Sequence, residues 1–381
     1  MHDALPTTTD AVIIGAGFAG LATAAELARR GLTRLVLLEA EPIPGQHSSG
    51  RNAAIARRVI EEAPLAELAV RSMARMAALT TPDGAPIFRP TGGLLLGDAA
   101  LTDRLLAVAR ALPALAADAL PLSAAAAIRR VPALAGAHFE RAVWTGGCGV
   151  VDIHALLMAL EHDLRAHLAP DPAHAGLFYA TPIVGVQTIG GRVSAVETPR
   201  GTIATPLLID AAGFHANRVA ALAGLGPLPF APVRRHLFVT APTALVARDA
   251  PWVWDGTGGW YFRPEGAGLL MCACDATPWP PDGPIATPTD PGAKDALAAK
   301  FADAVPGLAN IRPTRGWSGL RVLTPDHLFV IGPDPRIAGF HWVAGLGGHG
   351  MTTALAVGEV AADAILTGTV RPDFAPARFT R

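Results

Sequence analysis

The first residues along the chain that could do chemistry are three glycines and one acid. Gly15, Gly17 and Gly20 have the spacing of a turn that wraps around a pyrophosphate. The run 11–14 before them predicts a buried strand, and the alanine- and leucine-rich stretch after them predicts a helix whose free amide groups favour phosphate. Glu39 ends a second apolar run, where its carboxylate can accept hydrogen bonds from a ribose. Together these residues predict a dinucleotide-binding β–α–β unit.

Three later segments narrow the choice of dinucleotide. They are residues 45–52, Ala211-Ala212-Gly213 at the end of a predicted strand, and residues 347–351 at the start of the last predicted helix. In this order, and over essentially the whole chain, they resemble the D-amino acid oxidase superfamily of FAD enzymes. The resemblance implies FAD as a non-covalent cofactor. Some members attach their flavin through a histidine in a context similar to that of His47, so a covalent bond there stays open.

The same resemblance assigns the cofactor-binding residues. It places residues 48–54 beside the flavin and the adenine against the backbone near Ile183. By the same resemblance, the N-terminus of the last helix faces the pyrimidine end of the flavin, where the helix dipole stabilises negative charge. The predicted cofactor-binding residues are Gly15, Gly17, Gly20, Glu39, Ala40, His47, Ser48, Ser49, Arg51, Asn52, Ala53, Ala54, Ile183, Ala212, Gly213, Gly319, Gly347, Gly348, His349, Gly350, Met351 and Thr352.

The resemblance also suggests how a substrate is held. Oxidation of an amino acid needs a group that binds its carboxylate, and the planar fork of arginine suits this role. Arg321, in the segment 317–321, closely resembles the carboxylate-binding arginine of D-amino acid oxidases and dehydrogenases. Among these families the chain is most similar to bacterial D-arginine dehydrogenases, by which Arg235 contacts the substrate and Tyr261 donates its hydroxyl to the carboxylate. His349 is a candidate base by location, and equally a structural histidine beside the flavin.

Departures from that family change the expected substrate. No acid stands at residues 91–93 to hold a basic side chain, and Ile55, Ala56 and Arg57 replace the expected lid residues. Trp252 and Trp254 fall where aliphatic pocket residues are expected. We therefore predict oxidation of a small neutral or apolar D-amino acid to an imine, which hydrolyses to a 2-oxo acid and ammonia.

Two alternatives stay open. Residues 51–57 and 348–351 also resemble sarcosine oxidases, in which Arg57 would be the substrate-side arginine and glycine, N-methyl or cyclic amino acids the substrates. That family uses lysines near the flavin, whereas this chain has Thr352 after the Gly-His-Gly turn and only Lys294 and Lys300 elsewhere. A dehydrogenase or slow oxidase is therefore favoured, with a quinone, a dye-like acceptor or oxygen as electron acceptor. The second alternative is a flavoprotein subunit of an electron-transfer complex.

These residues need a scaffold of alternating helices and strands. Periodicity predicts helices over 61–79, 99–129 (broken by Pro113 and Pro121) and 151–168, and strands over 86–96, 183–196, 202–209 and 232–275. A proline-rich loop is expected at 277–291, and strands, a glycine loop and a helix at 317–367. We expect an α/β FAD-binding Rossmann-like domain with an interleaved α+β substrate domain on an antiparallel sheet. The FAD domain would comprise 1–85, 145–228 and 312–381, and the substrate domain 86–144 and 229–311.

Composition limits the partners. The 381 residues are 51% hydrophobic with a formal net charge of −1, so no general attraction to nucleic acid is expected. Cys148, Cys272 and Cys274 form neither a disulfide framework nor a metal-ligand set, so we predict reduced thiols and no metal site. We expect no signal peptide and no membrane span, since a glycine loop interrupts the uncharged stretch 337–358. A cytoplasmic protein is predicted, with peripheral attachment to the inner membrane face left open.

Overall fold

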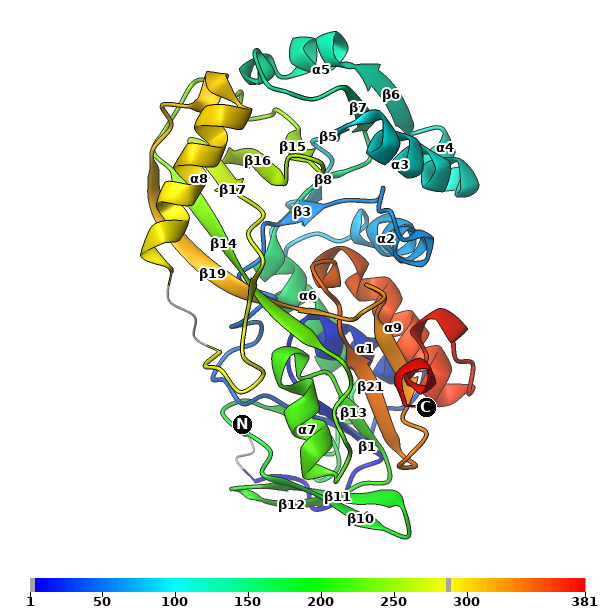
Figure 1. Ribbon diagram of the computed structural model, residues 1–381. Helices are drawn as coiled ribbons and strands as arrows, with labels where there is room; N and C mark the ends of the chain where they lie inside the picture. The colour runs from blue at the N-terminus through cyan, green and yellow to red at the C-terminus, as the bar shows by residue number, and fades with distance from the viewer. Residues whose placement is uncertain (1–3, 286–288, 381) are drawn as a thin grey trace.

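The computed structural model describes residues 4–285 and 289–380. Figure 1 shows a mostly parallel sheet in its lower half and a larger, mostly antiparallel sheet in its upper half. The predicted fold class, a Rossmann-like domain combined with an antiparallel sheet, is confirmed. No helix within the described residues is both long and apolar enough to cross a membrane.

The lower sheet has six strands in the order β20-β21-β13-β1-β2-β9. Only β20 runs antiparallel to its neighbour. Ala11 and Ile13 of β1 enter one core while Val12 and Ile14 enter another. Both faces of the strand are thus buried, which explains an unbroken apolar run in the sequence. The strands are β1 (Ala11–Ile14), β2 (Leu35–Leu38), β9 (Gly176–Phe178), β13 (Leu208–Asp210), β20 (Val330–Pro333) and β21 (Phe340–Ala344).

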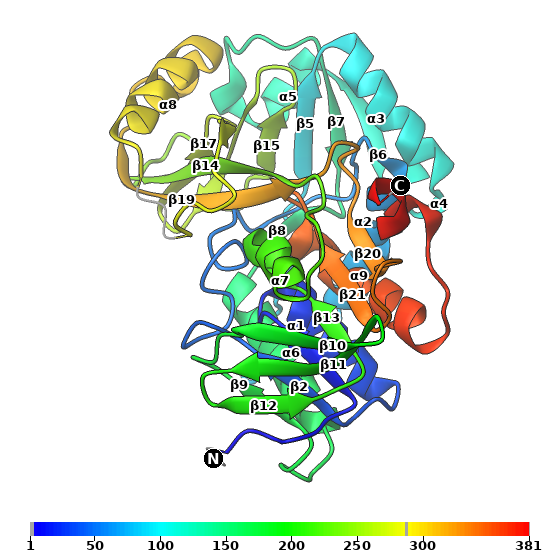
Figure 2. The ribbon, with the colours of Figure 1, turned by 60° about the horizontal axis from the view of Figure 1, so that its bottom comes forward.

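Helices pack beside one face of this sheet, and a small second sheet covers the other. The helices, which contact one another, are α1 (Phe18–Arg29), α2 (Ala63–Met76), α6 (Ile153–His167) and α9 (Gly350–Leu366). The opposite face carries α7 (Ala216–Leu222) and the antiparallel strands β10 (Gly185–Ile189), β11 (Arg192–Thr198) and β12 (Gly201–Ala204), seen in front in Figure 2.

The upper sheet follows the order β18-β14-β17-β16-β15-β5-β7-β6, with β19 pairing β14. Its strands are β5 (Gly93–Gly97), β6 (Ala119–Ser123), β7 (Arg141–Thr145), β14 (Ala231–Thr240), β15 (Trp252–Asp255), β16 (Trp260–Glu265), β17 (Gly268–Cys272), β18 (Thr277–Pro278) and β19 (Pro313–Leu323). Helices α3 (Ala99–Ala111), α4 (Pro113–Ala116), α5 (Ala124–Arg130) and α8 (Pro291–Ala304) accompany it. A third sheet joins β3 (Ile55–Ala56), β8 (Gly149–Val151) and β4 (Phe88–Arg89).

Two element predictions need correction. Residues 119–123 form strand β6 rather than helix, and Pro121 is tolerated because β6 is an edge strand that pairs only with β7. The predicted strand 202–209 is divided: β12 belongs to the small sheet and β13 to the six-stranded one, with Pro206 between them. Proline has no N–H for a ladder, so it interrupts the strand there. Residues 286–288 of the predicted loop 277–291 lie outside the described residues.

Strands β14 and β19 pair along their whole length, from Ala231 opposite Leu323 to Thr240 opposite Pro313. The predicted boundary at residue 312 would assign the two strands to different domains, although they share one sheet. The division of the chain into domains stays a prediction.

Candidate active site

A cavity of about 440 Å³ lies at the carboxyl ends of the parallel strands, against the upper sheet. Ile14, Leu38 and Ala211 line it from the ends of β1, β2 and β13. Leu237 of β14 and Leu320 of β19 line it from the upper sheet. Ligands of open α/β sheets bind outside this edge, so the fold places a binding site where the glycine motif predicts one.

The glycine loop forms a cradle in which side chains have no room. Gly15 has φ +101°, a conformation that favours glycine. A Cβ at Gly17 would lie 2.9 Å from the Ser49 hydroxyl oxygen, and one at Gly20 would overlap the Gly15 carbonyl oxygen. The N-cap residue of helix α1, Gly17, provides no side-chain cap, and the first turn of the helix contains no acid. Its N-terminus is therefore suited to a pyrophosphate.

Glu39 is held in place by the backbone on both of its oxygens. One oxygen accepts from the Ala16 N–H at 2.6 Å and the other from the Glu41 N–H at 2.9 Å. A carboxylate oxygen can accept more than one hydrogen bond, so both remain able to bind a ribose hydroxyl. Ala40 and Ile183 line the same end of the cavity.

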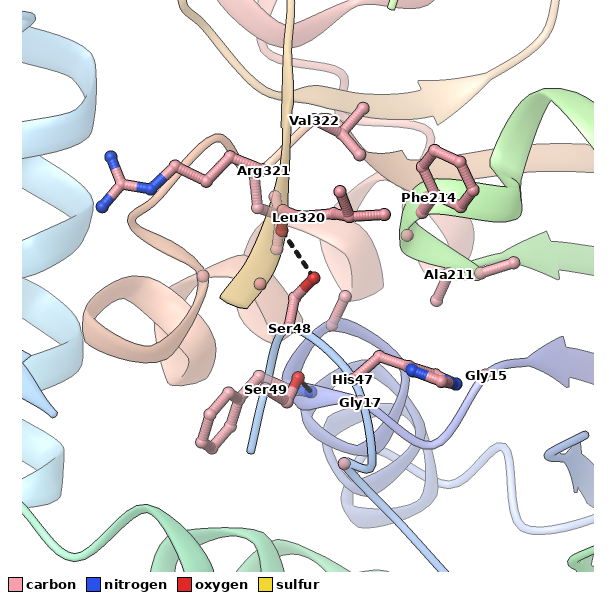
Figure 3. Close-up of a pocket in the computed structure, with 18 of the residues that line it drawn as sticks. Gly15, Gly17, His47, Ser48, Ser49, Ala211, Phe214, Leu320, Arg321 and Val322 are labelled. Atoms are coloured by element: carbon pink, nitrogen blue, oxygen red, sulfur yellow. Dashed lines mark hydrogen bonds between the residues drawn. The ribbon is translucent and has the colours of Figure 1, made fainter. Parts of the chain in front are cut away.

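His47 also lies at this dinucleotide end. Its Nε2 is 2.8 Å from a Glu41 carboxylate oxygen, and its Nδ1 is buried without a hydrogen-bond partner among the described residues. In Figure 3 the imidazole and the Arg321 side chain point to opposite sides of the site. The non-covalent binding of FAD stays a prediction. His215, whose pKa is lowered by burial and then by Arg218, lines the cavity nearby.

The segment from Ser48 to Ala54 is a tightly bonded loop. The Ser49 hydroxyl accepts from the Phe18 N–H at 3.0 Å. The Asn52 side chain donates to the Ser49 carbonyl at 2.6 Å and accepts from the Ala54 N–H at 2.7 Å. Ala54 has φ +59°, which is strained for a residue with a Cβ. The Asn52 side chain offsets that strain and fixes the loop against the cavity.

Arg321 projects from β19 into the opposite end of the cavity (Figure 3). Its guanidinium borders the glycine loop before α9, since a Cβ at Gly348 would lie 2.9 Å from Cζ. Burial, followed by the charge of Arg235, lowers the pKa of Arg321, which remains a cation. Burial raises the pKa of Tyr261 well above its ordinary value. The phenol is therefore protonated and able to donate a hydrogen bond to an anion.

Arg235 lines the same end but is already bonded to the backbone. Its Nε donates to the Asp275 carbonyl at 2.8 Å and one terminal nitrogen donates to the Cys274 carbonyl at 3.0 Å. The Asp275 carboxylate in turn contacts His236 Nδ1 at 2.7 Å. Arg235 thus has a fixed orientation and can offer a ligand only part of its hydrogen-bonding capacity.

Arg57 is the third guanidinium at this end. Its Cζ lies 4.4 Å from the centre of the Trp254 ring, and its Nε is buried without a hydrogen-bond partner among the described residues. A cation–π contact stabilises by about 0.5–2 kcal/mol. Removing an ion from water costs several kcal/mol, so the ring alone does not compensate the buried charge.

His349 lies within the influence of both cations. Burial, then Arg57 and Arg321, lowers its pKa well below the ordinary value, so the imidazole is neutral at neutral pH. His349 is also the N-cap residue of α9, which has no side-chain cap bond and no acid in its first turn. The open amide groups of this helix are thus free for the negative end of a cofactor.

The structure brings the predicted residues together. All of the predicted site residues line the cavity except Gly20, which instead packs α1 against the loop. Sequence reasoning missed Glu41, Phe214, His215 and Arg218. The last three stand shortly after the predicted Ala211–Gly213 segment, so extending that motif into the following helix would have found them. Ile285, which also lines the cavity, stands in the proline-rich stretch and carries no pattern that points to a site.

The parallel sheet, the glycine cradle and the cationic cavity together define a dinucleotide-binding oxidoreductase. Residues 10–364 match the model of the family described as FAD dependent oxidoreductase, and the chain belongs to this family. FAD is therefore its cofactor. The N-termini of α1 and α9, which have no acid in their first turns, and the side-chain-free glycine cradle fit such a group.

Relatives of known name fall within the same family. The chain is 29% identical to glycine oxidase of Pseudomonas aeruginosa over 371 residues, which is 92% of this chain and 93% of that protein. FAD-dependent oxidoreductase domain-containing protein 1 of Bos taurus is 28% identical over 42% of this chain, and the match spans only 36% of that protein. Among solved structures, L-proline dehydrogenase from P. horikoshii superposes with a TM-score of 0.84 at 24% identity, covering 98% of both chains. Because the identity to L-proline dehydrogenase is below 25%, this similarity is evidence for the fold alone.

Proposed function

We propose that this flavoenzyme oxidises the carbon–nitrogen bond of a small amino acid to an imine, which hydrolyses to a 2-oxo acid and ammonia. The observation that carries the proposal is the position of Arg321, a half-buried cation facing the cavity beside the N-terminus of α9. FAD supplies the two-electron acceptor when it is bound. The role of the protein is to hold the substrate carboxylate with Arg321 and Tyr261 and so to orient the reacting carbon.

The first candidate substrates are D-amino acids with neutral or apolar side chains, as the sequence predicts. Ile55, Leu237 and Trp254 give this end of the cavity apolar walls. The carboxylates that line the cavity within the described residues, Glu39 and Glu41, are at the dinucleotide end. A cationic side chain would therefore meet arginines without a compensating acid, which supports the exclusion of basic substrates.

Glycine, N-methyl and cyclic amino acids are the second candidates. The observation that favours them is that Arg57, the substrate-side arginine of that alternative, lines the same cavity. The resemblance of this enzyme to glycine oxidase agrees with either substrate class.

The electron acceptor is proposed to be a quinone or a dye-like acceptor, with oxygen reacting slowly. Lys300 does not line the cavity, and its Nζ donates to the carbonyls of Gly259 at 2.7 Å and Ala273 at 3.1 Å. Lys300 is therefore not positioned to speed the reaction of the reduced flavin with oxygen. A cytoplasmic location remains part of the proposal.

Anaerobic bleaching of the flavin by D-, L- and N-methyl amino acids tests the proposal. The rate should rise with pH, because the substrate amine must be neutral to react. Arg321→Met should keep the flavin and lose at least about 100-fold in reduction efficiency, since a bidentate charged contact disappears. Arg315→Met, at an exposed position of the same strand, is the matched control and should behave as the wild type. Absence of bleaching by every amino acid tested would exclude the proposed reaction.

A further inference from the structure

We infer that the preferred substrate carries a second carboxylate, on its side chain or on its nitrogen, and that Arg57 binds it. The inference rests on the proposed function and deepens it: among the small amino acids that this cavity admits, those with a second carboxylate are oxidised most efficiently, and those without one are poorer substrates. It identifies a second anion subsite in the cavity, separate from the subsite formed by Arg321 and Tyr261.

The first observation is that Arg57 lacks a partner that its neighbour has. Arg58 forms an ion pair with Asp118. Arg57 faces the cavity and, within the described residues, contacts the Trp254 ring without an ion pair. The Nε atoms of both arginines are buried and unbonded, so the ion pair with Asp118 is what distinguishes Arg58 from Arg57. Buried charges in proteins are normally paired, so an unpaired cation at a cavity wall points to an anionic ligand.

The second observation is the charge balance of the cavity. Arg57, Arg235 and Arg321 line its substrate end, and His349 beside them is neutral. The acids that line the cavity within the described residues are bonded at the dinucleotide end, Glu39 to backbone amides and Glu41 to His47.

The acids that follow Arg57 in the chain do not neutralise it. Glu61 and Glu62 act on its charge from a distance, and neither lines the cavity. Glu61 is bonded to Arg104. The Asp275 carboxylate acts on the charge of Arg235. A substrate with one carboxylate, bound at Arg321, would therefore leave the charge of Arg57 uncompensated.

The third observation is that the two anion subsites are held relative to each other by one rigid side chain. Trp254 contacts both Arg57, whose Cζ lies 4.4 Å from the centre of the Trp254 ring, and Tyr261, whose ring centre lies 4.7 Å from that of Trp254. One carboxylate can bind Arg321 and Tyr261 while Arg235 keeps its two carbonyl partners. Arg57 is then the group left for a second carboxylate.

Matched pairs of acids and amides test this inference in the FAD-loaded enzyme. D-Aspartate is compared with D-asparagine for a side-chain carboxylate, and N-carboxymethylglycine with N-carbamoylmethylglycine for a carboxylate on nitrogen. Each amide has nearly the size of its acid but lacks the charge. We expect anaerobic flavin reduction to be at least about tenfold more efficient with the acid of one pair, because a charged contact is gained. The pair that shows the preference identifies which position carries the carboxylate.

Variants of Arg57 assign the preference to this residue. Arg57→Met should reduce the acid-to-amide ratio to about one, and Arg57→Lys should keep part of it, since it retains a charge without the planar fork. Arg58→Met, which removes the neighbouring charge outside the cavity, should leave the ratio unchanged. Flavin content and melting temperature verify that each variant folds. A ratio that is the same in Arg57→Met and the wild type would overturn the inference.

A binding measurement separates this inference from the proposed reaction. Malonate and its monoamide are titrated against the flavin spectrum, which requires no turnover. Tighter binding of malonate in the wild type but not in Arg57→Met supports the second subsite even if no amino acid reduces the flavin. Reduction by neutral amino acids together with equal binding of malonate and its monoamide would retain the proposed reaction and exclude the second subsite.

Discussion

The Ser48 hydroxyl donates a hydrogen bond to the carbonyl oxygen of Leu320 over 2.7 Å. This bond joins the loop beside the cofactor site to the residue that precedes Arg321 on β19. A second bond reinforces it, since Trp317 Nε1 donates to the Arg51 carbonyl at 3.0 Å. The loop and the strand that carries the carboxylate-binding arginine are therefore fixed to each other.

Replacement of Ser48 by alanine tests this coupling. One hydrogen bond of about 1 kcal/mol is lost, so substrate affinity should weaken about fivefold. The apparent dissociation constant from anaerobic reduction measures it. Ser194→Ala is the control, because the Ser194 hydroxyl also bonds a backbone carbonyl, that of Gln187 at 3.1 Å, on the distant small sheet. Equal affinities in Ser48→Ala and Ser194→Ala would show that the loop does not position Arg321.

Tyr261 offers a second test of the carboxylate site. Tyr261→Phe removes a neutral donor to a charged acceptor, a contact of about 1.5–3 kcal/mol, and should raise KM at least about tenfold. Rapid-reaction kinetics should show most of the loss in binding rather than in the limiting rate. The chain has one other tyrosine, Tyr179, which bonds Glu161 at 2.7 Å and does not line the cavity. Tyr179→Phe should keep the wild-type KM. An equal rise of KM in both variants would show that Tyr261 does not bind the substrate carboxylate.

The sequence was sufficient for features that depend on local chemistry. The β1–α1–β2 unit could be predicted because a glycine spacing, two buried strands and one acid lie within about forty residues and are all local signals. The strand-rich segment 232–275 could be predicted because alternating and apolar runs identify strands directly.

The features that the sequence could not give depend on distant partners. Pro121 predicts a break in a helix, and only the pairing of β6 with β7 shows that it stands in an edge strand. The lack of a partner for Arg57 is likewise invisible in the sequence, since Arg58 beside it finds Asp118. Which of two adjacent arginines is paired is decided by residues far along the chain.

The glycine cradle gives a prediction about cofactor loading. A Cβ at Gly20 would overlap the Gly15 carbonyl oxygen, which is backbone and cannot move aside without opening the loop. Gly20→Ala should therefore be recovered with little or no flavin, as measured by the ratio of flavin to protein absorbance. Gly226→Ala is the control, because the nearest atom to its Cβ would be an Arg336 nitrogen at 3.7 Å. Normal flavin content in Gly20→Ala would show that the cradle tolerates a side chain.

Glu26 of α1 gives a prediction about stability. Its carboxylate is almost fully buried and bonds Arg29, Arg30 and Arg75, with Arg30 Nε at 2.8 Å and an Arg75 terminal nitrogen at 3.2 Å. Removing one partner of a buried pair leaves charges uncompensated, so Glu26→Gln should lower the free energy of unfolding by about 3 kcal/mol at neutral pH. Glu61→Gln, which removes an exposed pair with Arg104, should cost less than about 1 kcal/mol. Urea denaturation of the FAD-loaded enzyme measures both changes.

The effect of Glu26 should depend on pH in a defined direction. Burial raises the pKa of Glu26, but the hydrogen bond from Arg30 and the charges of Arg75 and Arg29 outweigh it, so the pKa in the folded protein is below the ordinary value of 4.5. The unfolded chain therefore binds the proton first as the pH falls, and the stability that Glu26 contributes above pH 4.5 is lost as the pH passes down to its folded pKa. Below that value Glu26 is neutral, like glutamine, and the difference between wild type and Glu26→Gln should shrink. A difference that stayed constant from neutral pH into acid would show that packing, rather than the charge of Glu26, stabilises this part of the fold.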